Sequence, residues 1–136
     1  MVKILVIGSG AREHAIIKSL NKSKKEKEIY CLASNNNPGI SDICNELKII
    51  DINNSEIIKD YSIKQSINIA IIGPENPLAY GVADYLWDAG IGVIGPKKNL
   101  AQIETSKSFT RNLLREYKIP GCPKFKTFTN MEGVEN

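Results

Sequence analysis

The sequence predicts an α/β protein, with a parallel sheet that carries helices on both faces in the Rossmann-like manner. Apolar runs such as Val2–Ile7 and Ile69–Ile72 alternate with amphipathic stretches of helical spacing. Strands that are apolar throughout are typical of a parallel sheet buried on both faces. The chain has 136 residues, of which 42% are hydrophobic and 24% charged. Such a chain is long enough to bury a substantial core.

The first half of the chain predicts three strands. The first, Val2–Ile7, leads through a glycine turn into a helix from Ala11 to about Leu20, whose apolar residues recur at helical spacing. A second strand is expected at Ile29–Ala33, followed by a turn-rich loop over residues 34–41. The third strand is expected at Leu47–Ile52.

The next segment continues the alternation. A helix is expected from Asn54 to about Gln65 with Ser55 as its cap, followed by the strand Ile69–Ile72. Residues 73–77 break this strand, and a helix is expected over Leu78–Ala89, where Gly90 stops it. The last strand of the sheet is expected at Ile91–Ile94.

The character of the sequence changes after Pro96. Helices are expected at Leu100–Ile103 and from Ser106 to about Tyr117, then a proline-rich segment and a strand at Lys126–Thr129. The final residues resemble the first turn of a further helix. We therefore expect one domain over residues 1–100 and, over residues 101–136, the beginning of a second domain inside which the chain stops.

Composition argues against several classes of function. The net charge is only +3, and the lysine-rich residues 22–27 lack interleaved aromatic residues, which favours a solvated surface over nucleic-acid binding. Three cysteines without C-x-x-C spacing predict neither a metal site nor a disulfide framework, so reduced thiols in the cytoplasm are expected. We expect no signal peptide and no membrane contact, because no apolar run is long enough to span a bilayer.

The candidate site lies in the loops after the first, second and fourth strands, because ligands bind beyond the carboxyl ends of parallel strands. The glycine turn and the start of the first helix offer unpaired N–H groups, a partial positive charge and the guanidinium of Arg12 to an anion. The expected substrate-binding residues here are Gly8, Ser9, Gly10, Ala11, Arg12 and Glu13. Asn37, Gly39 and Glu75 are expected to line the same pocket.

Several of these roles have alternatives. Arg12 is suited either to a phosphate or substrate carboxylate or to an internal contact with Glu13 or a neighbouring loop. His14 is more often structural than a ligand contact in such a position, and Glu13 is expected to face the positive helix start. Glu75 is suited to ribose hydroxyls or an amine, or to capping the following helix. Glu13 occupies the third position of a dinucleotide fingerprint and no acid ends the second strand, which argues against an NAD-dependent oxidoreductase.

Several motifs carry a resemblance to one family. The string Gly-Ser-Gly-Ala-Arg-Glu-His-Ala at residues 8–15 resembles the amino-terminal motif of the phosphoribosylamine–glycine ligases, a family of the ATP-grasp superfamily in purine biosynthesis. Asn-Pro-Gly at 37–39, Gly-Pro-Glu-Asn-Pro-Leu at 73–78 and the segments at 95–96 and 104–109 match further motifs in the same order. The family often has glycine at the position of Ala11, whose methyl group would narrow the loop slightly.

The resemblance implies an ATP-dependent ligase that joins glycine to 5-phosphoribosylamine. Its cofactors would be ATP and magnesium or manganese, bound mainly by regions that this chain lacks. The turn Gly8–Glu13 would hold the sugar phosphate and Lys107 would contact ATP, whereas no catalytic residue and no metal ligand are assigned here. The chain by itself is expected to be catalytically incomplete. The alternatives are another enzyme with the same amino-terminal domain, such as a formate-using transformylase or a carboxylase, or a Rossmann-type nucleotide-binding module.

Overall fold

The computed structural model describes residues 1–130 and 132 and divides the chain into two compact units, Met1–Ala101 and Gln102–Asn136. The first unit contains five parallel strands in the order β3-β2-β1-β4-β5. Their bounds are β1 Val2–Ile7, β2 Lys27–Ala33, β3 Glu46–Ile49, β4 Ile69–Ile72 and β5 Gly92–Ile94. The predicted fold class is confirmed.

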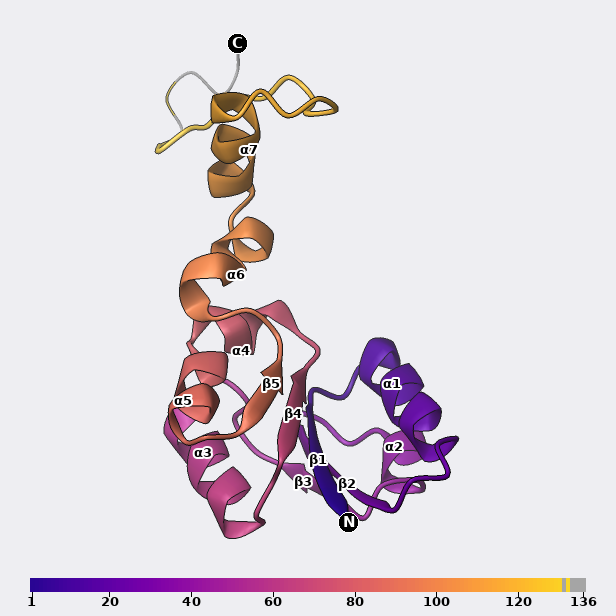
Figure 1. Cartoon of the computed structure of the whole chain (residues 1–136). Coiled ribbons are helices and arrows are strands. Elements are labelled where there is room, and N and C mark those ends of the chain that lie inside the picture. The colour runs from indigo at the N-terminus through magenta and orange to yellow at the C-terminus, as the bar shows by residue number, and fades with distance from the viewer. Residues whose placement is uncertain (131, 133–136) are drawn as a thin grey trace. The chain divides into compact units, whose positions relative to one another are not determined.

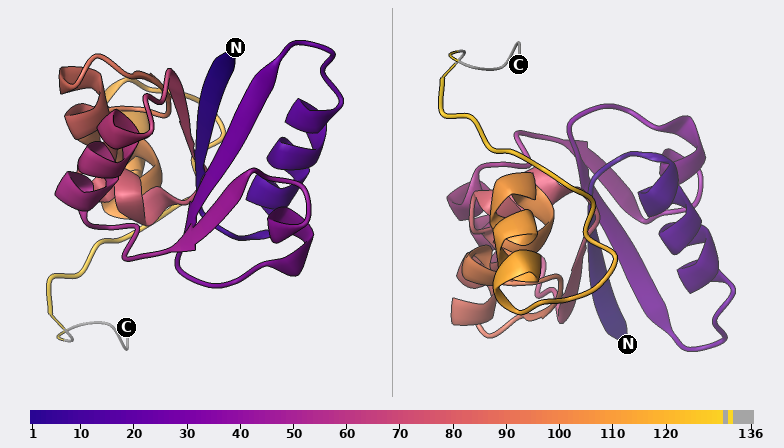
Figure 2. Two further views of the ribbon diagram at one scale, coloured as in Figure 1. Left: turned by 90° about the horizontal axis from the view of Figure 1, so that it is seen from below. Right: turned by 90° about the horizontal axis from the view of Figure 1, so that it is seen from above.

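Helices cover both faces of this sheet, as Figures 1 and 2 show. The helices α1 (Ala11–Asn21) and α2 (Pro38–Ser41) lie on one face, and α3 (Ser55–Lys64) and α5 (Val82–Asp88) lie on the other. The short helix α4 (Glu75–Ala79) follows β4 directly. Helix α6 (Lys98–Thr105) contains the boundary between the two units, and α7 (Lys107–Glu116) belongs to the second unit.

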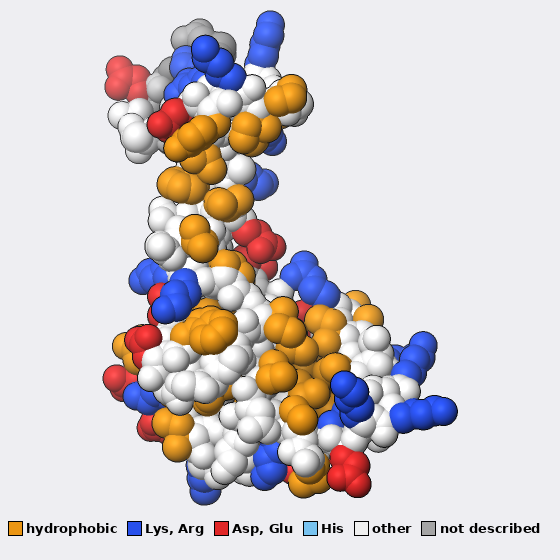
Figure 3. All heavy atoms as spheres, in the orientation of Figure 1, with side chains coloured by type: hydrophobic (Ala, Val, Ile, Leu, Met, Phe, Trp, Pro, Cys, Tyr) orange, Lys and Arg blue, Asp and Glu red, His pale blue; other side chains and the backbone are white. Residues whose placement is uncertain are grey.

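The alternation of side chains along the strands explains why these strands are apolar throughout. Leu5 and Ile7 of β1 enter the core beneath α3 and α5, whereas Val6 enters the core beneath α1 and α2. All three side chains have an exposed fraction of 0%. At β4 and β5, the face that carries α1 retains the exposed side chains of Ile69 and Ile94. Figure 3 shows hydrophobic side chains gathered over the sheet on the face turned to the viewer.

The structure corrects two predicted features of the helices that follow β3 and β4. Asn54, and not Ser55, caps α3, because its side-chain oxygen accepts a hydrogen bond from the N–H of Ile57 at 3.1 Å. The helix expected over residues 78–89 is divided into α4 and α5 at Gly81, whose φ of 84° is left-handed. Glycine adopts this conformation without the steric cost that other residues meet, so the chain can turn there.

Two other predictions are wrong, one for a loop and one for a strand. The loop expected over residues 34–41 contains the short helix α2, which begins after Asn37 and has Pro38 at its first position. Residues 126–129 form no strand, since no neighbouring strand pairs with them among the described residues. The expected helical turn at the end of the chain falls largely on residues 131 and 133–136, outside the described residues.

Candidate functional site

A cavity lies where the strand order of the sheet reverses. β2 and β3 follow β1 toward one edge, whereas β4 returns to the other side of β1, and such a point is where open α/β sheets bind ligands. The loops after β1 and β4 meet there around a cavity of about 340 Å³. Its lining residues are Gly8, Ser9, Gly10, Glu13, Ser34, Ile52, Asn53, Pro74, Asn76 and Pro77.

Glu13 occupies the centre of the glycine turn. Its side chain is only 5% exposed, and its Oε2 accepts a hydrogen bond from the N–H of Gly10 at 2.6 Å. The expected position of this carboxylate at the start of α1 is therefore confirmed. The amide of Gly10 is committed to Glu13, so an incoming phosphate must use other donors.

Three glycines make room for the Glu13 side chain. A β-carbon added at Gly8, Gly10 or Gly73 would lie 2.9 Å, 2.9 Å or 2.5 Å, respectively, from an atom of Glu13. Real β-carbons do not approach other atoms so closely, because the van der Waals contact distance is longer. The shape of the glycine turn thus follows from a buried carboxylate as well as from access for a ligand.

Arg12 makes the internal contact that was one of its two predicted roles. It is exposed, and its Nη1 donates a hydrogen bond to the carbonyl oxygen of Gly73 at 2.5 Å. This bond joins the start of α1 to the loop after β4. Because a guanidinium carries five N–H donors, the contact leaves donors for a ligand.

Asn37, Gly39 and His14 hold the loop after β2 against the glycine turn. The side-chain amide of Asn37 donates to the carbonyl oxygen of Ser9 at 2.9 Å, and its Oδ1 caps α2 at Ile40. A β-carbon at Gly39 would lie 2.8 Å from Nε2 of His14, so the imidazole packs on this glycine. Neither Asn37 nor Gly39 is among the residues that line the cavity, and the structure gives both a supporting position.

The remaining expected contacts divide between the cavity and the surface. Ser9 lines the cavity, whereas Ala11 is exposed at the first position of α1. Glu75 is exposed at the first position of α4, and its neighbours Pro74 and Asn76 line the cavity in its place.

Sequence reasoning missed three polar lining residues, Ser34, Asn53 and Asn76. Asn53 lies in the loop after β3, and this loop ends at the same edge of the sheet as the loops that were considered. The rule that ligands bind beyond the carboxyl ends of parallel strands was the signal that could have included it. The side-chain oxygen Oδ1 of Asn53 is buried and has no hydrogen-bond partner among the described residues.

A buried thiol of the neighbouring strand β2 forms a hydrogen bond with the glycine turn. Cys31 of β2 is 0% exposed, and its Sγ donates to the carbonyl oxygen of Gly8 at 3.3 Å. Burial, and to a smaller extent the nearby Cys44 and Glu13, together raise the pKa of Cys31 from 9.0 to about 12.

This pKa predicts a loss of stability at high pH. Above pH 9 the unfolded thiol loses its proton while the folded thiol keeps it, so the contribution of Cys31 is present below pH 9 and is lost as the pH rises toward about 12. We expect the difference in unfolding free energy between wild type and Cys31→Ala to shrink by about 1–2 kcal/mol between pH 8 and pH 10.5. Urea denaturation at both pH values measures it, and an unchanged difference would contradict the assignment.

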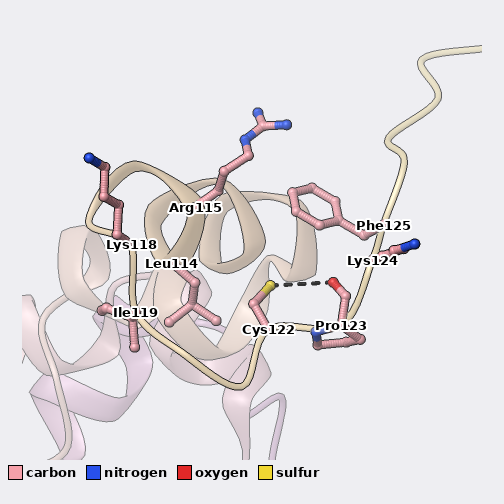
Figure 4. A pocket seen from close by; sticks show the side chains of 8 residues that line it. All are labelled: Leu114, Arg115, Lys118, Ile119, Cys122, Pro123, Lys124 and Phe125. Atoms are coloured by element: carbon pink, nitrogen blue, oxygen red, sulfur yellow. Dashed lines mark hydrogen bonds between the residues drawn. The ribbon is translucent and has the colours of Figure 1, made fainter.

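The second unit contains cavities of its own. One, of about 600 Å³, is lined by the side chains shown in Figure 4, where Leu114 of α7 lies between Ile119 and Cys122 of the segment that follows the helix. Lys107, the first residue of α7, lines a cavity of about 370 Å³ with Arg111 and Lys126 among others. Three cationic side chains at one cavity favour an anionic ligand.

No helix in the described part of the chain is long and apolar enough to cross a membrane. No three histidine, cysteine, aspartate or glutamate side chains among the described residues lie together as metal ligands would.

Comparison with sequence families and curated proteins identifies close relatives. Residues 2–104 match the model of the phosphoribosylglycinamide synthetase N domain. The chain is 45% identical over 128 residues to a phosphoribosylamine–glycine ligase of Methanosarcina barkeri and 45% identical over 127 residues to one of Methanocaldococcus jannaschii. These alignments cover 94% and 93% of this chain but only 30% and 28% of the relatives. The chain therefore spans about 30% of the length of the curated relatives it matches.

Solved structures share the fold at low sequence identity. An N5-carboxyaminoimidazole ribonucleotide synthetase from Thermotoga maritima aligns with a TM-score of 0.71 and 20% identity, over 97% of this chain and 35% of that protein. A phosphoribosylglycinamide synthetase from Anaerococcus prevotii aligns with a TM-score of 0.62 and 13% identity, over 86% of this chain and 29% of that protein. At these identities the likeness concerns the fold alone.

Proposed function

The chain belongs to the phosphoribosylglycinamide synthetase family, whose N domain it carries, and on that premise we propose that it binds the 5-phosphoribosylamine substrate of a glycine ligase. The observation that carries the proposal is the cavity at the reversal point of the sheet, built from the motifs that the family shares. The first unit is then the substrate domain, and residues 102–136 begin the ATP-grasp domain.

In this proposal the phosphate binds at the start of α1. The N–H groups of the first helical turn have no carbonyl partner within the helix, and Arg12 adds a fixed positive charge beside them. Gly8, Ser9, Gly10 and Glu13 shape the adjoining cavity. Glu75 accepts a hydrogen bond from the substrate amine at the surface of α4, and Asn37 and Gly39 support the turn.

The full reaction needs more than this chain. The resemblance implies that ATP phosphorylates the carboxylate of glycine and that the amine of phosphoribosylamine then attacks the acyl carbon and releases phosphate. Lys107 lines a cavity with Arg111 and Lys126, and this cluster of cations supports a contact of Lys107 with a nucleotide phosphate. We assign magnesium or manganese, and most contacts to ATP, to the part of the relatives' length that this chain does not span.

Family membership favours this ligase over the two other candidates, a transformylase or carboxylase with the same fold and a dinucleotide oxidoreductase. The buried Glu13 in the third fingerprint position further disfavours a dinucleotide, because its side chain fills the space where the fingerprint needs a small residue between helix and strand. We place the protein in the cytoplasm, consistent with three free cysteines.

The test is a titration of the 136-residue chain with ribose 5-phosphate. Binding is measured by isothermal calorimetry and by the shifts of backbone amide signals in nuclear magnetic resonance spectra. We expect binding with a dissociation constant on the order of 1 mM, since most of the relatives' length is missing. A folded chain that binds no ribose 5-phosphate, or that binds NADH with micromolar affinity by fluorescence transfer, would refute the proposal.

A further inference from the structure

The cavity of about 600 Å³ in the second unit has a lining that is apolar at its centre and cationic around it (Figure 4). Three of its eight described lining residues, Arg115, Lys118 and Lys124, are cationic, and none carries a carboxylate. Sites for small molecules commonly have volumes of about 300–1,000 Å³, with a mostly apolar lining and a few polar groups. The proposed function leaves this cavity unused, because Lys107 lines a different one.

Apolar side chains at the centre of the cavity remain partly open to water. Figure 4 shows Leu114 of α7 between Ile119 and Cys122 of the segment that follows the helix. Ile119 has an exposed fraction of 46%, and Leu114 and Phe125 are half-buried. A ligand with an apolar part would remove these side chains from water, which is favourable in proportion to the area covered. The centre of the cavity therefore suits a hydrocarbon chain or ring and not a phosphate group.

The cationic side chains supply positive charge around this apolar centre. Lys118 and Lys124 are exposed, and neither forms an ion pair with a described residue. Arg115 is held in place, since its Nη2 donates to Oδ1 of Asn112 at 2.9 Å and its guanidinium lies 5.2 Å from the centre of the Phe125 ring. Because no carboxylate among the described lining residues opposes these charges, they attract an anionic group.

We propose that this cavity binds an amphiphilic organic anion, whose apolar part lies against Leu114 and Ile119 and whose acidic group faces Lys118 and Lys124. The ligand is a small molecule with one acidic group, because the apolar centre offers nothing to the successive charges of a polyanion. The site is separate from the proposed sugar-phosphate and ATP contacts, so this inference and the proposed function can fail independently. Cys122 lies in the wall of the cavity and reports on its occupancy.

The test uses octanoate as the probe and the thiol of Cys122 as the reporter. Iodoacetamide forms a sulfur–carbon bond with an accessible thiol and releases iodide and a proton, and mass spectrometry of the peptides gives the rate at each cysteine. Octanoate at ten times its dissociation constant should slow the reaction of Cys122 about tenfold, because only the empty cavity admits the reagent. Cys44, half-buried in the first unit, is the internal control and should react at an unchanged rate.

Acetate and 1-octanol separate the two halves of the proposed ligand. At the same concentration acetate should not protect Cys122, since it lacks the apolar part, and 1-octanol should bind about threefold to tenfold more weakly than octanoate, since it lacks the charge. Protection by either compound equal to that by octanoate refutes the proposed class of ligand. No protection by octanoate, or equal slowing at Cys44, shows that the cavity is not the binding site.

The double variant Lys118→Gln/Lys124→Gln tests the contact with the acidic group. Its affinity for octanoate should fall about threefold to tenfold, while its affinity for 1-octanol stays unchanged. Both lysines are exposed, so their replacement leaves the packing intact, which circular dichroism verifies. Lys22→Gln/Lys24→Gln, which removes two exposed lysines of the first unit, is the matched control and should bind octanoate as wild type does. Equal affinity of the two double variants for octanoate would overturn the proposal.

Discussion

Gly73→Ala is expected to lower the free energy of unfolding by about 2–3 kcal/mol, because the added methyl group has no space. Gly73 is buried, and a β-carbon there would overlap Oε1 of Glu13 and lie 2.5 Å from its Cδ. The Glu13 side chain is buried and bonded to the N–H of Gly10, so moving it aside costs this hydrogen bond. Urea denaturation followed by circular dichroism measures the loss.

A double mutant separates this overlap from other effects of alanine. In Glu13→Ala the carboxylate is gone, so adding Gly73→Ala to that background should cost less than about 0.5 kcal/mol. Gly90→Ala is a matched surface control: nothing lies within 4 Å of its β-carbon, and its cost comes only from a φ of 77°. If Gly73→Ala destabilises both backgrounds equally, Glu13 is not the residue that requires glycine at this position.

The strands of the sheet could be predicted because each is marked by the residues within it, without reference to distant parts of the chain. Each central strand is an uninterrupted apolar run, and such runs alternate with helices only in a few architectures. The fully buried side chains of β1 show the physical reason, since Leu5 and Val6 point into different cores and neither can be polar. Only the order of the strands needed the structure, because it depends on contacts between residues far apart in the chain.

The helix boundaries were less predictable, since several residues can perform the same local role. Ser55 and Asn54 are both good caps, and the structure selects Asn54, while Ser55 Oγ donates to the carbonyl oxygen of Tyr80 at 3.0 Å. Gly81 lay within a stretch of helical spacing, where a single glycine costs only about 1 kcal/mol. Its left-handed φ divides this stretch into α4 and α5.

The location of the site could be predicted from the sequence, but the residues that line it could be predicted only in part. Gly8, Ser9, Gly10 and Glu13 line the cavity, because their positions follow from the end of a single strand. Asn53 was missed, and Asn37 lies behind the turn, because their positions depend on how three separate loops pack together. Sequence spacing cannot distinguish a side chain that lines a cavity from one that lies behind the lining residues and supports them.

Arg12→Ala is expected to lower the affinity for ribose 5-phosphate strongly. Hydrogen bonds to charged groups contribute about 1.5–3 kcal/mol, so loss of the guanidinium should weaken ribose 5-phosphate binding by a factor of about 10–100. The folded state should lose less than about 1 kcal/mol, because Arg12 is exposed and, among the described residues, its side chain makes one internal bond, to the carbonyl oxygen of Gly73. Calorimetry and urea denaturation of the same preparation measure the two quantities.

Arg12→Lys and a neutral ligand identify the physical origin of this loss. Lysine keeps the charge but not the planar fork, so its affinity for ribose 5-phosphate should lie between those of wild type and Arg12→Ala. Unphosphorylated ribose should bind wild type and Arg12→Ala equally, and the preference of wild type for the phosphorylated sugar should decrease with added salt. If Arg12→Ala weakens both sugars alike, the arginine acts by holding the loop at Gly73 and not by contacting the phosphate.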